Sequence, residues 1–230
     1  MSGTSKMKFI TAVGTAILGA TLLSGSALSA NLKFMTSTSY FEDISMRKVI
    51  FVANKNFAKV FDYTTAPIGY MNFCAHGEKE CQFKTDNALR VAMKPEQLEQ
   101  LNQVNTYVNT KIKPVSDAQT FGVPDLWAYP ISSGDCEDYV LLKKRYLQGL
   151  GFSADQLLIT VVLDENGAGH AILTVMTDQG DLILDNRRNE ILKWNKTGYK
   201  FLKRQSQADA SVWVSLRQNS PQVLVSSQSN

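Results

Sequence analysis

The stretch "SSGDCEDYVLLKKRYLQGLG", residues 132–151, predicts the helix that organises the fold. Asp135 stands at the expected N-cap or next to it, and Gly149 or Gly151 can end the helix. Basic residues at 143–145 are expected to face outward, near the helix end that favours positive charge. Cys136 then lies in the first turn, where the helix dipole favours a thiolate over a thiol.

Acidic neighbours oppose the ionisation of this cysteine. Cys136 lies between Asp135 and Glu137, and Asp138 follows. A cysteine nucleophile acts as a thiolate, and nearby negative charges raise the pKa of a thiol. Either Cys136 is inert, or something close to it offsets the three carboxylates.

A second helix is predicted over residues 95–112. Pro95 suits its first turn, and Pro114 lies beyond its end. Its apolar face is formed at helical spacing by Leu98, Leu101, Val104 or Asn105, Val108 and Ile112. Asn105 and Asn109 lie near this face, where they either hydrogen-bond an adjacent loop or remain in solvent.

After the cysteine helix, the hydrophobic pattern changes to a period of two. Short β-branched or leucine-rich segments at 157–164, 170–177 and 181–185 predict an antiparallel meander. Two further strands are expected within 198–204 and 210–217. The order of helix, loop, helix and antiparallel sheet is that of an α+β domain.

The composition fits one globular domain, since 44% of the 230 residues are hydrophobic and 20% are charged. Beyond the first thirty residues, 22 basic and 21 acidic residues leave a net charge of 22 − 21 = +1. This balance indicates no nucleic-acid partner. We expect the domain at 67–218, an N-terminal extension at 31–66 and a mobile polar tail at 219–230.

Residues 1–30 have the pattern of a secretory signal peptide. Lys6 and Lys8 precede an apolar run over 9–23, and small residues lead to Ala27 and Ala30. The run falls short of the about 20 apolar residues that a membrane-spanning helix needs. We therefore expect cleavage after Ala27 or Ala30 and an exported, soluble protein.

The chain has three cysteines, so a single disulfide leaves one thiol over. Cys74 and Cys81 are close together in a polar loop, and an oxidising compartment favours a bond between them. The alternatives are two free thiols or a metal clip that uses His76. Cys136 is the unpaired thiol if the disulfide forms.

Cys136, His170 and Asp185 occur in the chain order of papain-like nucleophilic catalysis. His170 could take the proton of the thiol and later donate it to a leaving amine. Asp185 would orient the imidazole, and the backbone N–H of Cys136 could stabilise an oxyanion. The alternative is structural: a small buried cysteine, a satisfied strand histidine and an aspartate in a turn.

The expected turn between the last two strands of the meander opposes this triad. A two-residue turn at Gln179 and Gly180 pairs Asp185 with Thr174, four residues beyond His170. That offset is about 13 Å at the rise of a strand. Only a bulge, a strong twist or a longer loop would close the gap.

The motifs "GDCEDYVLLKKRYLQGLGF", "GHAILTV" and "GDLILDN" resemble those of the bacterial transglutaminase-like cysteine peptidases. This family includes the LapG-type periplasmic adhesin proteases, and the similarity spans Pro67 to Trp213. The resemblance implies an α+β papain-like or transglutaminase-like fold. It also implies hydrolysis of a peptide bond through a thioester, with Cys136 as nucleophile, His170 as general base and Asp185 as orienting acid.

The same resemblance implies a calcium ion, held by Asp135 and Glu137 with Asp138 as a third ligand. Several carboxylates suit Ca²⁺, although acids at this position also suit a helix N-terminus. The implied setting is the periplasm, with an envelope protein such as a surface adhesin as substrate and an inhibitory membrane receptor. The paired cysteines, however, are more typical of members without an evident adhesin substrate.

Two other functions remain open. A transglutaminase would pass the same thioester to an amine, and a non-catalytic module would bind calcium and a protein partner. Zinc held by Asp135, Cys136 and His170 is a weaker alternative, because the chain lacks a close Cys-x-x-Cys or histidine pair.

Overall fold

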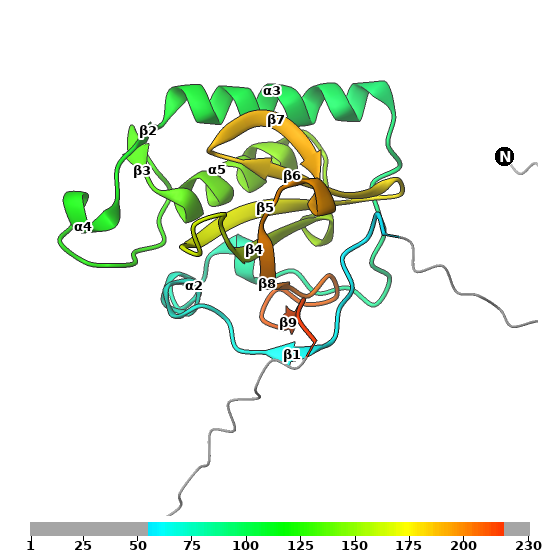
Figure 1. Ribbon diagram of the computed structural model, residues 1–230, viewed down its shortest axis with the longest axis horizontal. Helices are drawn as coiled ribbons and strands as arrows, with labels where there is room; N and C mark the ends of the chain where they lie inside the picture. Colours follow the sequence, from blue (N-terminus) through cyan, green and yellow to red (C-terminus); the bar gives the residue numbers. More distant parts are fainter. Residues whose placement is uncertain (1–54, 219–230) are drawn as a thin grey trace, which may run out of the picture. The chain divides into compact units, whose positions relative to one another are not determined.

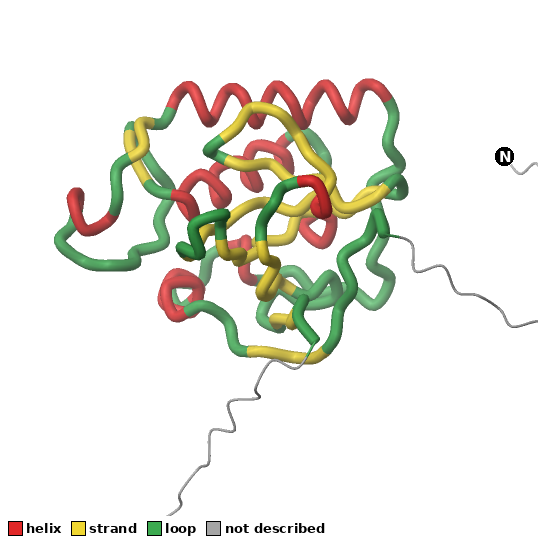
Figure 2. The backbone as a smooth tube through the Cα atoms, viewed as in Figure 1, coloured by secondary structure: helices red, strands yellow, loops and turns green. Residues whose placement is uncertain are grey.

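The computed structural model describes residues 55–218, whose architecture is shown in Figures 1 and 2. The signal peptide at 1–30, most of the extension at 31–66 and the tail at 219–230 lie outside the described residues, so their assignments stay predictions. Within the described range, no helix has the length and apolar character to cross a membrane.

A seven-stranded sheet forms the centre of the described domain. Its order is β1-β9-β8-β4-β5-β6-β7, and every neighbouring pair is antiparallel. The strands are β1 (Asp62–Thr64), β4 (Leu157–Leu163), β5 (Gly169–Thr177), β6 (Gly180–Asp185), β7 (Arg188–Lys193), β8 (Lys200–Gln205) and β9 (Trp213–Ser215). The predicted meander corresponds to β4, β5 and β6, which confirms the α+β class.

Two long helices pack against each other and against this sheet (Figure 1). Helix α5 (Cys136–Gly149) contacts β5 and β4, and helix α3 (Pro95–Lys111) contacts β7 and β6. The shorter elements are α2 (Ile68–Cys74), η1 (Lys79–Cys81), β2 (Lys113–Pro114), α4 (Asp117–Thr120), β3 (Ser133–Gly134), η2 (Ala154–Gln156) and η3 (Trp194–Lys196). Both long helices occur where the sequence predicts them.

The central strands are buried on both faces, which explains their nearly continuous apolar runs. Ile159 and Leu173 belong to the main core with α3 and α5. Alternate residues, including Val162 and Ile172, belong to a second cluster that also contains Tyr199.

The prediction that the basic residues of α5 face outward is wrong for two of them. Lys143 and Lys144 are buried because α5 packs against both α3 and the sheet. The Lys144 ammonium donates hydrogen bonds to the carbonyl oxygens of Ala154 and Leu157. Neither acceptor can be recognised from the helix sequence.

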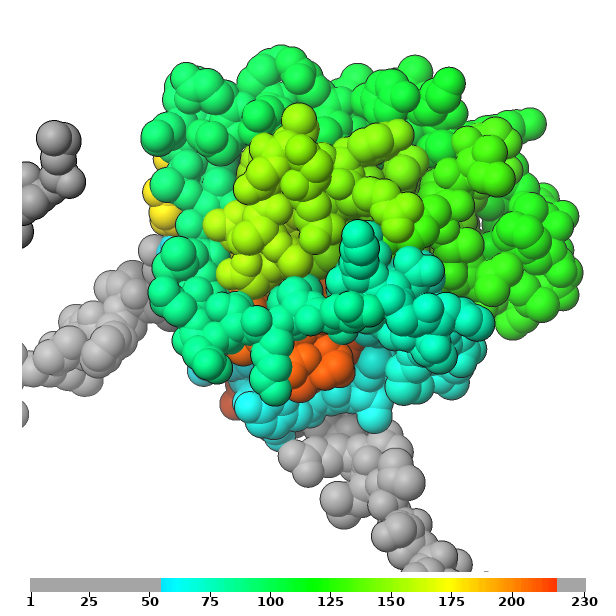
Figure 3. All heavy atoms as spheres, turned by 180° about the vertical axis from the view of Figure 1, so that it is seen from behind, coloured from blue at the N-terminus to red at the C-terminus, as the bar shows by residue number. Residues whose placement is uncertain are grey.

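Cys74 and Cys81 form a disulfide, with Cα atoms 5.6 Å apart, and Cys136 is free. This confirms the predicted pairing and excludes both alternatives for the two cysteines. The closed loop lies along α5, where Arg145 Nε is 3.5 Å from Glu80 Oε1. In Figure 3 this loop (teal) lies beside α5 (yellow-green).

Candidate active site

Cys136 lies in the first turn of α5, as predicted; it is the first residue of the helix, and Asp135 is the N-cap. The Asp135 side chain does not cap α5, however. Its Oδ2 accepts a 3.1 Å hydrogen bond from the backbone N–H of Asp117, the first residue of α4. The residue before the cysteine therefore ties two helix starts together.

The Cys136 sulfur has one donor and one acceptor beside it. Sγ accepts a 3.3 Å hydrogen bond from the backbone N–H of Ala171, and the thiol donates to Glu137 Oε2 at 3.2 Å. Burial raises the pKa of the Cys136 thiol, and the negative charge of Glu137 raises it further. The protein groups alone therefore favour the thiol.

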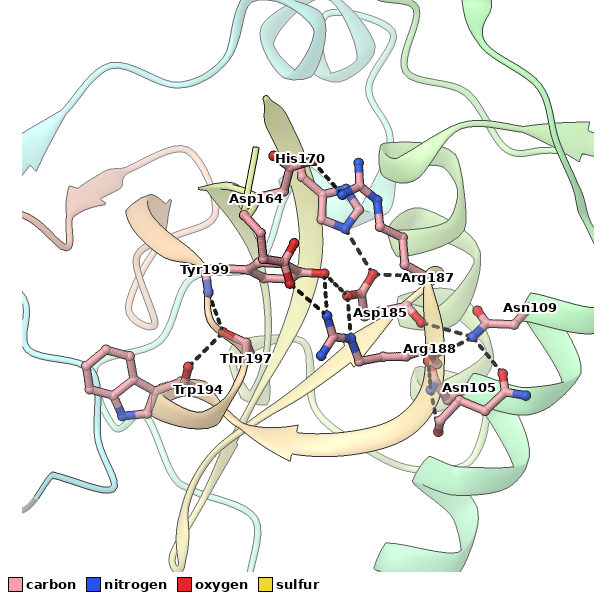
Figure 4. A network of polar contacts seen from close by, with 12 residues as sticks. Asn105, Asn109, Asp164, His170, Asp185, Arg187, Arg188, Trp194, Thr197 and Tyr199 are labelled. Atoms are coloured by element: carbon pink, nitrogen blue, oxygen red, sulfur yellow. Dashed lines mark hydrogen bonds and ion pairs between the residues drawn. The ribbon is translucent and has the colours of Figure 1, made fainter. Parts of the chain in front are cut away.

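His170 is buried near the start of β5, and its two ring nitrogens differ in their surroundings. Nε2 lies 2.9 Å from Asp185 Oδ1 (Figure 4). Nδ1 has no hydrogen-bond partner among residues 55–218. The imidazole is thus held at one nitrogen and left free at the other.

The register of β5 and β6 corrects the expected turn and halves the expected offset between His170 and Asp185. Thr177 pairs with Gly180, so the turn consists of Asp178 and Gln179 rather than Gln179 and Gly180. The same ladder continues to Leu173 and Leu184. Asp185 therefore lies about two residues, rather than four, from the level of His170, and a bulge in the β6–β7 pairing adds local bending.

Both carboxylate oxygens of Asp185 have partners. Oδ1 accepts from His170 Nε2 and from the backbone N–H of Arg187 at 3.0 Å. Oδ2 accepts a 2.6 Å hydrogen bond from the Tyr199 hydroxyl and lies 3.5 Å from Arg188 Nε. Burial alone would raise the pKa of Asp185, but the hydrogen bonds from His170 and Tyr199 lower it to about 2. Asp185 is therefore ionised at neutral pH.

Asn105 and Asn109 of α3 hold the turn that follows Asp185. Asn109 Nδ2 donates to the Asp185 carbonyl at 2.9 Å, and Asn105 Nδ2 donates to the Asn189 carbonyl at 3.0 Å. Both amides also contact the Arg188 carbonyl at 3.2 Å (Figure 4). The prediction that these asparagines form hydrogen bonds is confirmed, but their backbone acceptors are the last residue of β6 and the first two residues of β7 rather than a loop.

Cys136 and His170 line the same open cleft, which has a volume of about 400 Å³. Its other walls include Pro67, Trp127, Val161, Gly169 and Lys203. The Trp127 indole is fixed there by a 2.9 Å hydrogen bond from Nε1 to Asp125 Oδ1. A polypeptide segment in this cleft would pass over the cysteine and the histidine together.

Beside the cleft, acidic side chains from distant segments converge. Asp117, Asp135 and Asp138 offer carboxylate oxygens within 4.8 Å of one another. Of the predicted ligands, Asp135 and Asp138 thus come together, whereas Glu137 belongs to an overlapping group with Asp117 and Asp125. The sequence reasoning missed Asp117, which follows Ser116 in an ordinary capping motif and carries no signal of its own.

The charges in this cluster are poorly compensated by the protein. Asp117 Oδ1 and Asp135 Oδ1 are buried without a hydrogen-bond partner in the described part of the chain. Burial raises the pKa of Asp138 to about 7. Burial, and then Asp135, raise the pKa of Glu137 to about 9. Buried carboxylates with spare oxygens are suited to a hard divalent cation.

A helix that begins with a cysteine and packs on an antiparallel sheet with a buried histidine defines the papain-like and transglutaminase-like class of cysteine hydrolases. The chain belongs to the family of bacterial transglutaminase-like cysteine proteinases, BTLCP, whose family model matches residues 60–221. It is therefore a cysteine peptidase, and the alternative of a non-catalytic binding module is not supported.

Solved structures of LapG from Legionella pneumophila are similar to this chain. One is 29% identical, with coverage of 54% of this chain and 71% of that chain and a TM-score of 0.45. A calcium-bound LapG is 26% identical over 58% of this chain and 76% of that chain, with a TM-score of 0.46. An EGTA-treated LapG is 28% identical, with coverage of 54% of this chain and 69% of that chain and a TM-score of 0.45. The comparison with curated proteins finds no match.

Proposed function

We propose that this chain is an exported, periplasmic cysteine endopeptidase that hydrolyses a peptide bond in a cell-envelope protein. Cys136 is the nucleophile, His170 the general base and acid, and Asp185 the orienting acid. One observation carries the proposal: His170 shares a cleft with Cys136 and is bound to Asp185 through Nε2, while its Nδ1 has no partner within the described domain.

The first half of the reaction forms a thioester. His170 Nδ1 takes the proton of the Cys136 thiol, and the sulfur attacks the carbonyl carbon of the scissile bond. The oxyanion accepts a hydrogen bond from the Cys136 backbone N–H, which has no intrahelical partner at the helix start. His170 then donates its proton to the leaving amine, and the C–N bond breaks.

The second half releases the acid. A water molecule gives a proton to His170 and attacks the thioester carbonyl carbon. The C–S bond breaks, and the sulfur recovers the proton from His170. Asp185 keeps the imidazole in one orientation in both halves and stabilises the imidazolium.

We further propose that Asp117, Asp135 and Asp138 hold calcium, with Glu137 adjacent to the ion. The unpartnered carboxylate oxygens of Asp117 and Asp135 support this ligand set. A bound Ca²⁺ would supply positive charge near Cys136, which lowers the pKa of the thiol. The proposed ligands differ from those expected from the sequence because Asp117 takes the place of Glu137.

The proposed substrate is an envelope protein such as a surface adhesin, and the proposed regulator is an inhibitory membrane receptor. Both partners rest on the resemblance of the sequence motifs alone. The open cleft beside Cys136 is compatible with an extended protein segment.

The test compares the purified protein with its Cys136→Ala variant on an envelope fraction in calcium and in chelator, with a fluorescent primary amine present. We expect new protein N-termini only with the unmodified protein and only in calcium, without incorporation of the amine. Cleavage by Cys136→Ala would refute the proposed nucleophile. Amine incorporation without new N-termini would instead support transglutaminase activity.

A further inference from the structure

Tyr199 contacts both members of the His170–Asp185 pair. Its hydroxyl donates the 2.6 Å hydrogen bond to Asp185 Oδ2, and its ring meets the imidazole of His170 edge to face. The two ring centroids are 5.6 Å apart, with an interplanar angle of 83°. Figure 4 shows the phenol beside the carboxylate and the imidazole.

Tyr199 has further contacts besides its hydrogen bond to Asp185. Arg188 Nη2 donates to the Tyr199 hydroxyl at 3.1 Å. The Tyr199 backbone N–H donates to Thr197 Oγ1 at 3.2 Å, and the Thr197 hydroxyl donates to the Trp194 carbonyl at 3.0 Å. The ring itself packs in the apolar cluster with Ile172. A group fixed in this way can orient its neighbour.

We propose that Tyr199 is a positioning residue for the peptidase reaction, acting through Asp185. A carboxylate bound only through Oδ1 is free to rotate, whereas a second hydrogen bond at Oδ2 stops that rotation. Oδ1 then stays on His170 Nε2, and the Tyr199 ring edge limits tilting of the imidazole. The consequence is that the imidazole keeps one orientation in the wall of the cleft, and this inference therefore rests on the proposed triad.

The surrounding charges leave the Tyr199 hydroxyl as a neutral donor. Asp185 is faced by His170 from β5, by Arg187 from the turn after β6, by Arg188 from β7, and by Lys143 from α5. Burial, and then the hydrogen bond to Asp185, raise the pKa of Tyr199 to about 12. The hydroxyl therefore keeps its proton over the range in which a cysteine peptidase works.

The decisive variant is Tyr199→Phe, which removes the hydroxyl and keeps the ring. We expect kcat to fall about tenfold with KM unchanged, because proton transfer by a misaligned imidazole is slower. The rate at which iodoacetamide alkylates Cys136, measured as a function of pH, should fall together with kcat. When Asp185→Asn is already present, adding Tyr199→Phe should change the alkylation rate less than about twofold. The effects of the two substitutions do not add, because Tyr199 acts through Asp185.

Tyr70→Phe is the matched control. The buried Tyr70 hydroxyl donates to the Ala210 carbonyl at 3.0 Å and accepts from Gln205 Nε2 at 2.7 Å. This variant should lower the Tm and leave kcat within about twofold, since a lost buried hydrogen bond costs stability.

The inference is overturned by an unchanged kcat in Tyr199→Phe, or by an equal effect of this variant in the Asp185→Asn background. If Tyr70→Phe and Tyr199→Phe have equal Tm values and lose equal amounts of kcat, the effect of Tyr199 is one of stability alone. Tyr199 would then be a structural residue and not a positioning residue. Failure of the triad itself has a different signature, since Asp185→Asn would then retain full activity whatever Tyr199→Phe does.

Discussion

The backbone N–H of Asp117 donates a 3.1 Å hydrogen bond to Oδ2 of Asp135, the residue that immediately precedes the cysteine. The start of α4 and the start of α5 are thereby joined, and three carboxylates are gathered between them. Each member of this group can be changed without removing the cysteine or the histidine.

Asp117→Asn should weaken calcium binding. Calcium is expected to raise the Tm of the unmodified protein, because a ligand that binds only the folded state stabilises it by mass action. The variant should show a smaller rise at the same calcium concentration in a thermal unfolding assay. The exposed Asp86 supplies the control Asp86→Asn. Equal shifts in all three proteins would contradict the assignment of Asp117.

Gly134→Ala should disturb the same cluster from its other side. A Cβ at Gly134 would lie 2.5 Å from Asp138 Oδ2 and 2.9 Å from Asp138 Cβ, so the side chain must move. The 2.9 Å hydrogen bond from the Ala128 N–H to Asp138 Oδ1 would then be lost. We expect a lower calcium affinity by isothermal titration calorimetry.

Gly149→Ala is the control for this substitution. A Cβ at Gly149, the last residue of α5, meets no atom within 4 Å. Alanine there should stabilise the protein by about 0.5–1 kcal/mol through helix propensity and leave calcium affinity unchanged. If both alanine variants bind calcium as well as the unmodified protein does, the packing of Gly134 on Asp138 has no bearing on the ion.

Asp185→Asn should reduce kcat by on the order of 10⁴-fold while the fold is retained, because an amide neither fixes the required tautomer nor stabilises the imidazolium. Steady-state kinetics on a peptide from the identified cleavage site would measure this change. Asp178→Asn, in the exposed turn of the same hairpin, should leave kcat unaltered. Comparable losses in the two variants would indicate general damage to the hairpin.

The charge on Asp185 should also stabilise the fold above the pKa of an unfolded aspartate. Its pKa is about 2 in the folded protein. Because an aspartate in an unfolded chain has a pKa of about 3.9, the contribution of about 2–3 kcal/mol is present above that value and is lost as the pH falls toward 2. The stability gap between the unmodified protein and Asp185→Asn, measured by urea unfolding, should therefore narrow between pH 6 and pH 2. A constant gap would show that the charge contributes nothing.

The main elements were predictable because each carries a local signal. Helix α5 has an acidic start, a glycine at its end and helical spacing, and the meander consists of short runs rich in β-branched residues and leucine. The chain order of Cys136, His170 and Asp185 also singled out residues that the structure brings to one site. These are features that neighbouring residues determine among themselves.

The turn after β5 shows where such signals mislead. Gly180 is not a turn residue but the first residue of β6, with φ +135°. A Cβ there would lie 2.9 Å from the Asn56 carbonyl oxygen, which also accepts a hydrogen bond from the Asp181 N–H. The glycine is needed for the approach of a distant segment, and that segment cannot be recognised from the local pattern.

The buried lysines and Asp117 escaped prediction for a related reason. A lysine normally keeps its ammonium in water, so its burial requires acceptors from elsewhere in the chain. Lys144 finds them at Ala154 and Leu157, after the helix has ended. Asp117 joins Asp135 and Asp138 only because the β2–β3 pairing brings their segments together.

Helix α3 touches both halves of the site: it packs on α5, which starts with Cys136, and its Asn109 side chain holds the Asp185 carbonyl. The cysteine and the aspartate therefore cannot separate without disruption of the same helix. Loss of activity and loss of tertiary structure should occur at one denaturant concentration. A partially melted enzyme that still cleaves its substrate is not expected, and inactivation can serve as a direct measure of cooperative unfolding.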